Sequence, residues 1–249
     1  MIELKGTGIQ DLENFDWNEY FAYNNSHLLK LNFEGDCKIT EKEKKLITPS
    51  IQAFQIGEGS DGKHLMKVVK EYADKSEDSR YPDAMLWFIT EENRHSNTLK
   101  YFMQEQGIPL QKKIWTDKIF RKLRSHFRLQ CSVIVLVTAE MIALSYYTAL
   151  AKVTSSKVMP IICKQMLNDE LKHVVFQSFT LHKLSKQNTS LRNRMIRFFR
   201  SILMWGTLHV VWMQYHTILK AGGYTYTSFK KNCLGYLKQS KEIVKTGKV

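Results

Sequence analysis

The residues best suited to chemistry in this sequence are two copies of the motif Glu-x-x-His. The first copy runs from Glu92 to His95, and the second runs from Glu170 to His173. Side chains three positions apart lie on the same face of an α-helix, so each motif points a carboxylate and an imidazole in one direction. Carboxylate oxygens and imidazole nitrogens are ligands that suit iron and manganese. The two motifs therefore predict a metal site built by two helices.

Both motifs lie on helix faces that are otherwise apolar. The residues that share a face with the first motif are Met85, Phe88, Leu99 and Met103. The residues that share a face with the second are Cys163, Met166, Leu167 and Val174. A carboxylate on such a buried face costs several kcal/mol unless it is paired or bound to a metal. The burial of four charged or polar side chains thus favours metal ligation over a solvent-exposed role.

Glu140 is the predicted third carboxylate. It is the only charged residue between Arg128 and Lys152, and it lies within an apolar stretch with helical spacing. Metal ligation is the favoured role, and the alternative is an ion pair with a basic side chain from another helix.

Glu58 is the predicted fourth carboxylate, in preference to Glu71. Glu58 lies seven residues before Leu65 on the apolar face of its helix, whereas Glu71 points away from that face towards solvent. The neighbouring glycines weaken the helix at this point, and Asp61 is the reserve candidate.

These residues form a predicted set of six metal ligands. The set is Glu58, Glu92, His95, Glu140, Glu170 and His173. Four carboxylates largely balance two divalent ions, so we expect two iron ions, with manganese or a mixed manganese–iron pair as the alternative. Open coordination positions would bind O2 as a co-substrate. Asp169 and Glu91 are predicted to accept hydrogen bonds from the ligand imidazoles, although Glu91 could equally be a solvated surface residue.

Four long helices are predicted to position these ligands. Prolines and glycines mark helix ends, and apolar residues recur with helical spacing between them. The predicted core helices cover about residues 49–72, 82–106, 130–153 and 157–184. Further predicted helices cover about residues 16–31, 191–221 and 228–243. Short turns join the first and the second pair of core helices, and a connection of about twenty residues is the predicted crossover of an all-α four-helix bundle.

The motifs resemble those of a known superfamily. Residues 91–95 read EENRH, similar to the EENRH motif of soluble acyl-carrier-protein desaturases, and residues 169–173 read DELKH, similar to the DExRH motif of desaturases and bacterial multicomponent monooxygenase hydroxylases. The order Glu, ExxH, Glu, ExxH over about residues 49–184 is that of the ferritin-like di-iron carboxylate superfamily. The segments QIGEGSDGKHL, TAEMIALSYYTAL and LKAGGYTYTSF also resemble a group of compact bacterial ferritin-like proteins without an established activity.

The resemblance implies a ferritin-like four-helix bundle with a long crossover and extra N- and C-terminal helices. We expect residues 1–48 to be a helical extension, 49–184 to be the di-metal core and 185–249 to be a basic helical region packed on the core, as one domain overall.

The chain departs from these families at two places. Desaturases and the hydroxylases have a Thr about one turn after the third carboxylate, where this chain has Ala143 and Leu144. Tyr147 is the nearest polar side chain on that face and is the candidate catalytic residue, with a buried structural tyrosine as the alternative. Ribonucleotide reductase small subunits have a radical tyrosine one turn after the first motif, where this chain has Leu99, so radical storage of that type is not expected.

Charge is concentrated in the C-terminal quarter of the chain. Residues 183–249 contain thirteen Lys and Arg and the single acid Glu242, while the net charge of the whole chain is +13. A region this basic predicts an acidic partner, such as a carrier protein, RNA or an anionic small molecule, or else a solvated face. Four of its arginines open one predicted helix and could bind an anionic group. These are Arg192, Arg194, Arg197 and Arg200.

The remaining composition favours a cytoplasmic helical protein. The chain has 12 Gly and 4 Pro, few for a loop-rich protein, and its four cysteines are widely spaced, as expected for reduced thiols. We see no signal peptide and expect no membrane span, since the most apolar stretch contains Glu140.

An O2-activating oxidase or oxygenase is the function that we expect. Its substrate would be a small molecule or a carrier-bound group, an electron donor would supply electrons, and the protein would be a monomer or dimer. The alternatives are a non-catalytic iron-sequestering protein and a tRNA-directed hydroxylase of the same superfamily.

Overall fold

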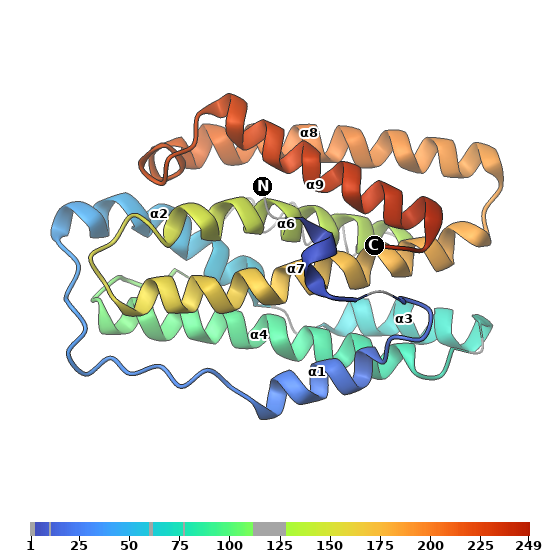
Figure 1. The fold of residues 1–249 in the computed structure, drawn as a ribbon, viewed down its shortest axis with the longest axis horizontal. Helices are drawn as coiled ribbons and strands as arrows, with labels where there is room; N and C mark the ends of the chain where they lie inside the picture. The colour runs from blue at the N-terminus through green and yellow to red at the C-terminus, as the bar shows by residue number, and fades with distance from the viewer. Residues whose placement is uncertain (1–2, 10, 60–61, 77, 112–127) are drawn as a thin grey trace. The chain divides into compact units, whose positions relative to one another are not determined.

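The computed structural model describes residues 3–9, 11–59, 62–76, 78–111 and 128–249. Within these ranges the regular secondary structure consists of helices, and there is no strand (Figure 1). The predicted all-α fold class is therefore confirmed. Most of the predicted crossover lies outside the described residues, and so does the reserve ligand Asp61.

The chain divides into two compact units, which are described separately. Unit 1 comprises Met1–Phe15, Val133–Val153 and Cys163–Val249. Unit 2 comprises Asp16–Ser132 and Thr154–Ile162.

Unit 2 is organised around one long helix, α4, which spans Tyr81–Glu105. Three other helices of this unit pack against it, namely α1 (Trp17–Ser26), α2 (Glu41–Glu58) and α3 (Lys63–Ser76). The chain leaves α4 at Gly107, whose φ of 65° suits glycine. The bounds of α4 agree with the prediction of a helix over residues 82–106.

Helix α2 begins eight residues earlier than the predicted start at Pro49. The side chain of Thr40 accepts a hydrogen bond from the backbone of Glu43, and the side chain of Glu43 accepts one from the backbone of Thr40. This capping box satisfies backbone donors at the true helix start, so Pro49 lies inside the helix. The prediction that Pro49 starts the helix was wrong.

The single helix predicted over residues 49–72 is divided into α2 and α3. Gly59 has an extended backbone, with φ −78° and ψ 121°, and Gly62 has a φ of 64°. A Cβ atom on Gly62 would lie 2.7 Å from Cδ1 of Ile89. The helix predicted over residues 49–72 is therefore interrupted after Glu58, and the positive φ and close packing at Gly62 both suit glycine.

Unit 1 contains a short 3-10 helix, Leu4–Thr7, and most of four long helices. These are α6 (Leu129–Leu150), α7 (Val158–Lys186), α8 (Ser190–Ala221) and α9 (Tyr226–Thr246), and the first residues of α6 and α7 belong to unit 2. Helices α8 and α9 are consecutive and pack against each other (Figure 1). A Cβ atom on Gly222, which follows α8, would lie 2.5 Å from the Cα atom of Ala149 in α6. Only glycine fits this approach of two backbones.

Helix α6 carries Glu140 and is the most apolar helix among the described residues. By length and composition alone it could cross a membrane, but 89% of its most apolar window is buried within the protein. A buried core helix meets the same criteria, which agrees with the expectation that this stretch is part of the core.

Candidate metal centre

Unit 2 brings three of the predicted ligands together at α2 and α4. One ligand atom each from Glu58, Glu92 and His95 lies within 4.8 Å of those of the other two. Nδ1 of His95 lies 3.8 Å from Oε1 of Glu92, as expected for residues three apart on a helix. All three side chains are buried, with exposed fractions of 7%, 8% and 2%. We call these residues the α2–α4 triad.

A pair of hydrogen bonds positions Glu58 relative to α4. The hydroxyl of Ser96, next to His95, donates to the backbone oxygen of Gln55 over 2.7 Å. The side-chain amide of Gln55 donates in turn to that hydroxyl over 2.9 Å. These bonds join the C-terminal end of α2 to α4 at Ser96, the residue after the predicted ligand His95. The sequence analysis did not identify Ser96 or Gln55.

Unit 1 brings the other three predicted ligands together at α6 and α7. Ligand atoms of Glu140, Glu170 and His173 again lie within 4.8 Å of one another. Nδ1 of His173 lies 3.4 Å from Oε2 of Glu170 and 3.9 Å from Oε2 of Glu140. Their exposed fractions are 3%, 0% and 0%. We call these residues the α6–α7 triad.

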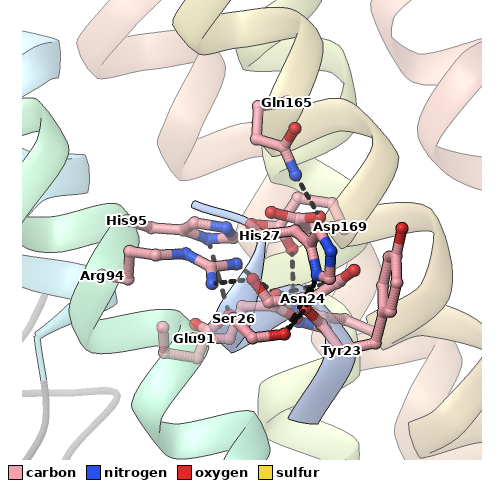
Figure 2. Close-up of polar contacts among 12 residues, drawn as sticks. Tyr23, Asn24, Ser26, His27, Glu91, Arg94, His95, Gln165 and Asp169 are labelled. Atoms are coloured by element: carbon pink, nitrogen blue, oxygen red, sulfur yellow. Dashed lines mark hydrogen bonds and ion pairs between the residues drawn. The ribbon is translucent and has the colours of Figure 1, made fainter. Parts of the chain in front are cut away.

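Glu91 belongs to a polar network that joins α1 to α4. Its carboxylate forms an ion pair with Arg94 and accepts a hydrogen bond from the side chain of Asn24 over 3.1 Å (Figure 2). Arg94 also donates to the backbone oxygen of Asn24 over 3.2 Å. Glu91 is buried, so the alternative of a solvated surface residue was wrong. Its predicted hydrogen bond to a ligand imidazole stays a prediction.

Asp169 is the corresponding residue of α7, directly before Glu170. It is buried and accepts a hydrogen bond from the side-chain amide of Gln165 over 2.8 Å (Figure 2). The ammonium group of Lys172 donates a hydrogen bond to the backbone oxygen of Thr7 and interacts electrostatically with Asp169. Burial lowers the pKa of Lys172, and the charge of Asp169 partly opposes that shift. The predicted role of Asp169, accepting a hydrogen bond from a ligand imidazole, also stays a prediction.

The structure also places the residues that the sequence analysis weighed but did not choose as ligands. Glu71 is exposed on α3, as predicted. Tyr147 is fully buried on α6, and its ring centroid lies 5.2 Å from that of Tyr146. Its burial agrees with the alternative of a buried structural tyrosine, and its catalytic role stays a prediction.

Gln177 is a buried residue that the sequence analysis missed. It lies on α7, one turn after His173, and neither its side-chain nitrogen nor its side-chain oxygen has a hydrogen-bond partner. A buried amide without partners is costly, which favours a role in contacting a bound molecule. Its spacing of four residues from His173, in an otherwise apolar stretch, was the available signal.

The chemistry of each triad fits a metal ion. Two carboxylates can neutralise one divalent ion, and the imidazole adds a nitrogen ligand. Buried carboxylates this close together repel each other unless a cation or a proton lies between them. Each buried cluster could therefore hold a metal ion.

Comparison with known proteins gives no match, whether to protein-family models, curated proteins or solved structures.

Proposed function

We propose that this protein is a ferritin-like, non-haem di-iron carboxylate protein that activates O2 to oxidise an organic substrate. The observation that carries the proposal is the pair of buried triads, each with ligand atoms of two Glu and one His within 4.8 Å of one another. The finer fold that we propose is a four-helix bundle of α2, α4, α6 and α7, in which the six residues hold two iron ions. The order of the ligands along the chain supports this arrangement.

The charges support two divalent ions rather than one. Four carboxylates and two neutral imidazoles carry a charge of −4, which two divalent ions cancel. A buried site that is close to neutral avoids the desolvation cost of an unbalanced charge. Iron is preferred over manganese because the motifs resemble those of di-iron proteins.

When bound, iron would supply the electrons that O2 needs and would leave the protein to control access and orientation. Most residues of α6 around Glu140 are buried and apolar, such as Val137, Met141 and Leu144, so they would exclude water from the reacting molecules. Gln177 would orient the substrate through its free amide group. The basic C-terminal region would favour an anionic or carrier-bound substrate, in line with the charge distribution.

Metal analysis and O2 consumption test this proposal. We expect about two iron ions per chain, antiferromagnetic coupling between them in the oxidised protein, and O2 uptake by the reduced protein. Coupling distinguishes a di-iron centre from two separate ions.

Glu140→Ala and Glu71→Ala provide a matched comparison, since both remove one carboxylate from a helix. Glu140→Ala should lose metal and O2 uptake, whereas Glu71→Ala, on an exposed face, should keep both. Absence of iron and manganese from the wild-type protein would contradict the proposal, as would an unchanged metal content in Glu140→Ala. Iron binding without oxidation of any organic substrate would favour iron sequestration instead.

A further inference from the structure

Arg200 is a fully buried cation outside the two triads. Three other arginines open α8, and all of them are exposed, whereas only 1% of Arg200 is exposed. Its Nη2 donates a hydrogen bond to the hydroxyl of Ser240 in α9 over 2.6 Å. That hydroxyl lies 2.5 Å from the hydroxyl of Ser178 in α7. The description of this arginine as part of a solvated face therefore does not apply.

Most of the hydrogen-bonding capacity of Arg200 is unused. Nε and Nη1 have no hydrogen-bond partner, which leaves three N–H groups of the guanidinium unsatisfied. No carboxylate in the described part of the chain pairs with it, and burial alone shifts its pKa. Burial lowers the pKa of Arg200 to about 10, so the side chain is still cationic at neutral pH.

The surroundings of Arg200 add positive charge rather than balance it. Lys241 follows Ser240 and is partly buried, with its ammonium group donating to the hydroxyl of Ser201 over 2.7 Å. Burial lowers the pKa of Lys241, and the charges of Arg200 and Arg197 lower it further. The acid next to it in sequence, Glu242, is exposed and lies 3.9 Å from Lys245. The group around Arg200 thus has an uncompensated positive charge.

A buried charge with unsatisfied donors costs several kcal/mol, and an anion removes that cost. The planar guanidinium matches the two oxygens of a carboxylate, which it can bind through two parallel hydrogen bonds. The hydroxyls of Ser178 and Ser240 can add a further donor. One guanidinium balances one carboxylate, and the buried Met204 and Leu208 on the same face of α8 favour an apolar body on the ligand.

We propose that Arg200, together with Ser178 and Ser240, binds the carboxylate of a small organic monocarboxylic acid. The site uses none of the predicted metal ligands. Ser178 lies five residues beyond His173, about 7.5 Å along the axis of α7, so the two clusters are separate features of unit 1. The proposal therefore does not depend on metal binding.

Thermal unfolding of the full chain in sodium acetate tests this site, with sodium chloride at the same ionic strength as the reference. Acetate should raise the melting temperature above the chloride reference, by an amount that grows with the logarithm of acetate concentration once this exceeds the dissociation constant. In Arg200→Gln, the dissociation constant for acetate should rise by roughly tenfold or more, since charged hydrogen bonds are lost.

Arg197→Gln is the matched control, because it removes the same charge one turn earlier on the exposed side of α8. Its acetate response should equal that of the wild-type protein. Ser240→Ala retains the charge and removes the hydroxyl, and should weaken acetate binding by roughly threefold to tenfold. This second variant decides the question if Arg200→Gln does not fold.

Three results would overturn the proposal. These are an equal effect of chloride and acetate, an equal loss of the response in Arg197→Gln, and a melting temperature that does not rise with the logarithm of acetate concentration. A Glu140→Ala variant that has lost its metal should still respond to acetate. Failure of the metal proposal and failure of this one are therefore distinguishable.

Discussion

The α2–α4 triad and the α6–α7 triad contain the same three residue types but are held by different kinds of backbone. Glu140, Glu170 and His173 all lie in the interior of long helices. Glu58 is the last residue of α2, directly before a stretch that contains Gly59 and Gly62. A residue at a helix end has fewer backbone hydrogen bonds around it than one in the interior. The comparison indicates a rigid set of ligands in unit 1 and an adjustable carboxylate in unit 2.

The carboxylates directly before the two motifs, Glu91 and Asp169, also differ in their contacts. In unit 2, Glu91 is paired with a cation, Arg94, and with Asn24 of another helix. In unit 1, Asp169 accepts a hydrogen bond from Gln165, a neutral amide of its own helix. The first arrangement fixes one helix to another, whereas the second joins two residues of the same helix.

The largest expected difference concerns loss of a ligand. If Glu170 is an iron ligand as proposed, Glu170→Ala should reduce iron affinity by more than about 100-fold, since loss of an outer contact alone costs about 10- to 100-fold. Glu58→Ala should reduce it by only about tenfold, because water can replace a carboxylate at a helix end. Competitive chelator titration measures both. Equal losses in the two variants would remove the distinction between a rigid and an adjustable triad.

The next effect concerns two glycines, one in each unit. Gly222→Ala should destabilise the protein by about 3 kcal/mol, because the new Cβ would meet backbone atoms of Ala149 at 2.5 and 2.9 Å. Gly62→Ala should cost about 1–2 kcal/mol, from its positive φ and a contact with the flexible end of Ile89. Urea unfolding measures these changes in free energy.

Gly206→Ala is the control for both, since nothing lies within 4 Å of its added Cβ. In the interior of α8 it should stabilise the protein by about 0.5–1 kcal/mol. A larger cost for Gly62→Ala than for Gly222→Ala would contradict the expectation that the backbone contact at Gly222 is less able to relax than the side-chain contact at Gly62.

A smaller effect is expected from the outer carboxylates. Asp169→Asn should weaken iron binding by about tenfold, as expected for a residue that polarises a ligand imidazole. Glu91→Gln should change iron affinity less, since Glu91 is already neutralised by Arg94, and should instead lower the melting temperature. Metal titration and thermal unfolding of the same two variants separate these outcomes. If Glu91→Gln weakens iron binding as much as Asp169→Asn, both carboxylates act on the metal ligands.

The smallest effect is a difference in acid sensitivity between the caps of the two units. Helices α1 and α2 of unit 2 are capped with the participation of Asp16 and Glu43, whereas α8 and α9 use Thr189, Thr225 and Ser228. The hydrogen bond from Arg80 lowers the pKa of Asp16 below its ordinary value of 3.8, and the backbone of Thr40 lowers that of Glu43 below 4.5.

A lowered pKa in the folded state means that the stabilisation is present above the ordinary value and is lost as the pH falls through the folded value. Below about pH 4, amide exchange should therefore accelerate in α1 and α2 before α8 and α9. Asp16→Asn should abolish the pH dependence of α1, at a cost of about 1 kcal/mol or less at neutral pH. An equal acceleration in all four helices would contradict this prediction.

The sequence predicted the helices whose ends have a strong local signal. The end of α4 follows from Gly107, and α8 ends before Gly222-Gly223, as expected from the glycines. The start of α2 was missed although its signal, Thr40 followed by Glu43, is present in the sequence. The proline was given more weight than the capping box, yet a proline within a helix is tolerated where packing supports it.

The candidate site was predictable to the extent that helix phase determines burial. Glu58, Glu140 and the two motifs were selected by their apolar neighbours, and all six residues are buried. The burial of Arg200 could not be predicted in this way, since arginine is rarely buried and its three neighbouring arginines are exposed. The partners Ser178 and Ser240 come from two other helices, so only the tertiary structure brings them to Arg200.

The approach of Gly222 to Ala149 has a consequence for sequence variation among relatives of this protein. Two backbones in contact leave no space for a side chain at position 222 and little at position 149. These positions should therefore vary together, with a residue larger than glycine at 222 accompanied by a shifted α6, since the Cα atom of residue 149 would still lie 2.5 Å from the added Cβ. A pair of this kind records a contact between distant parts of the chain in the sequences themselves.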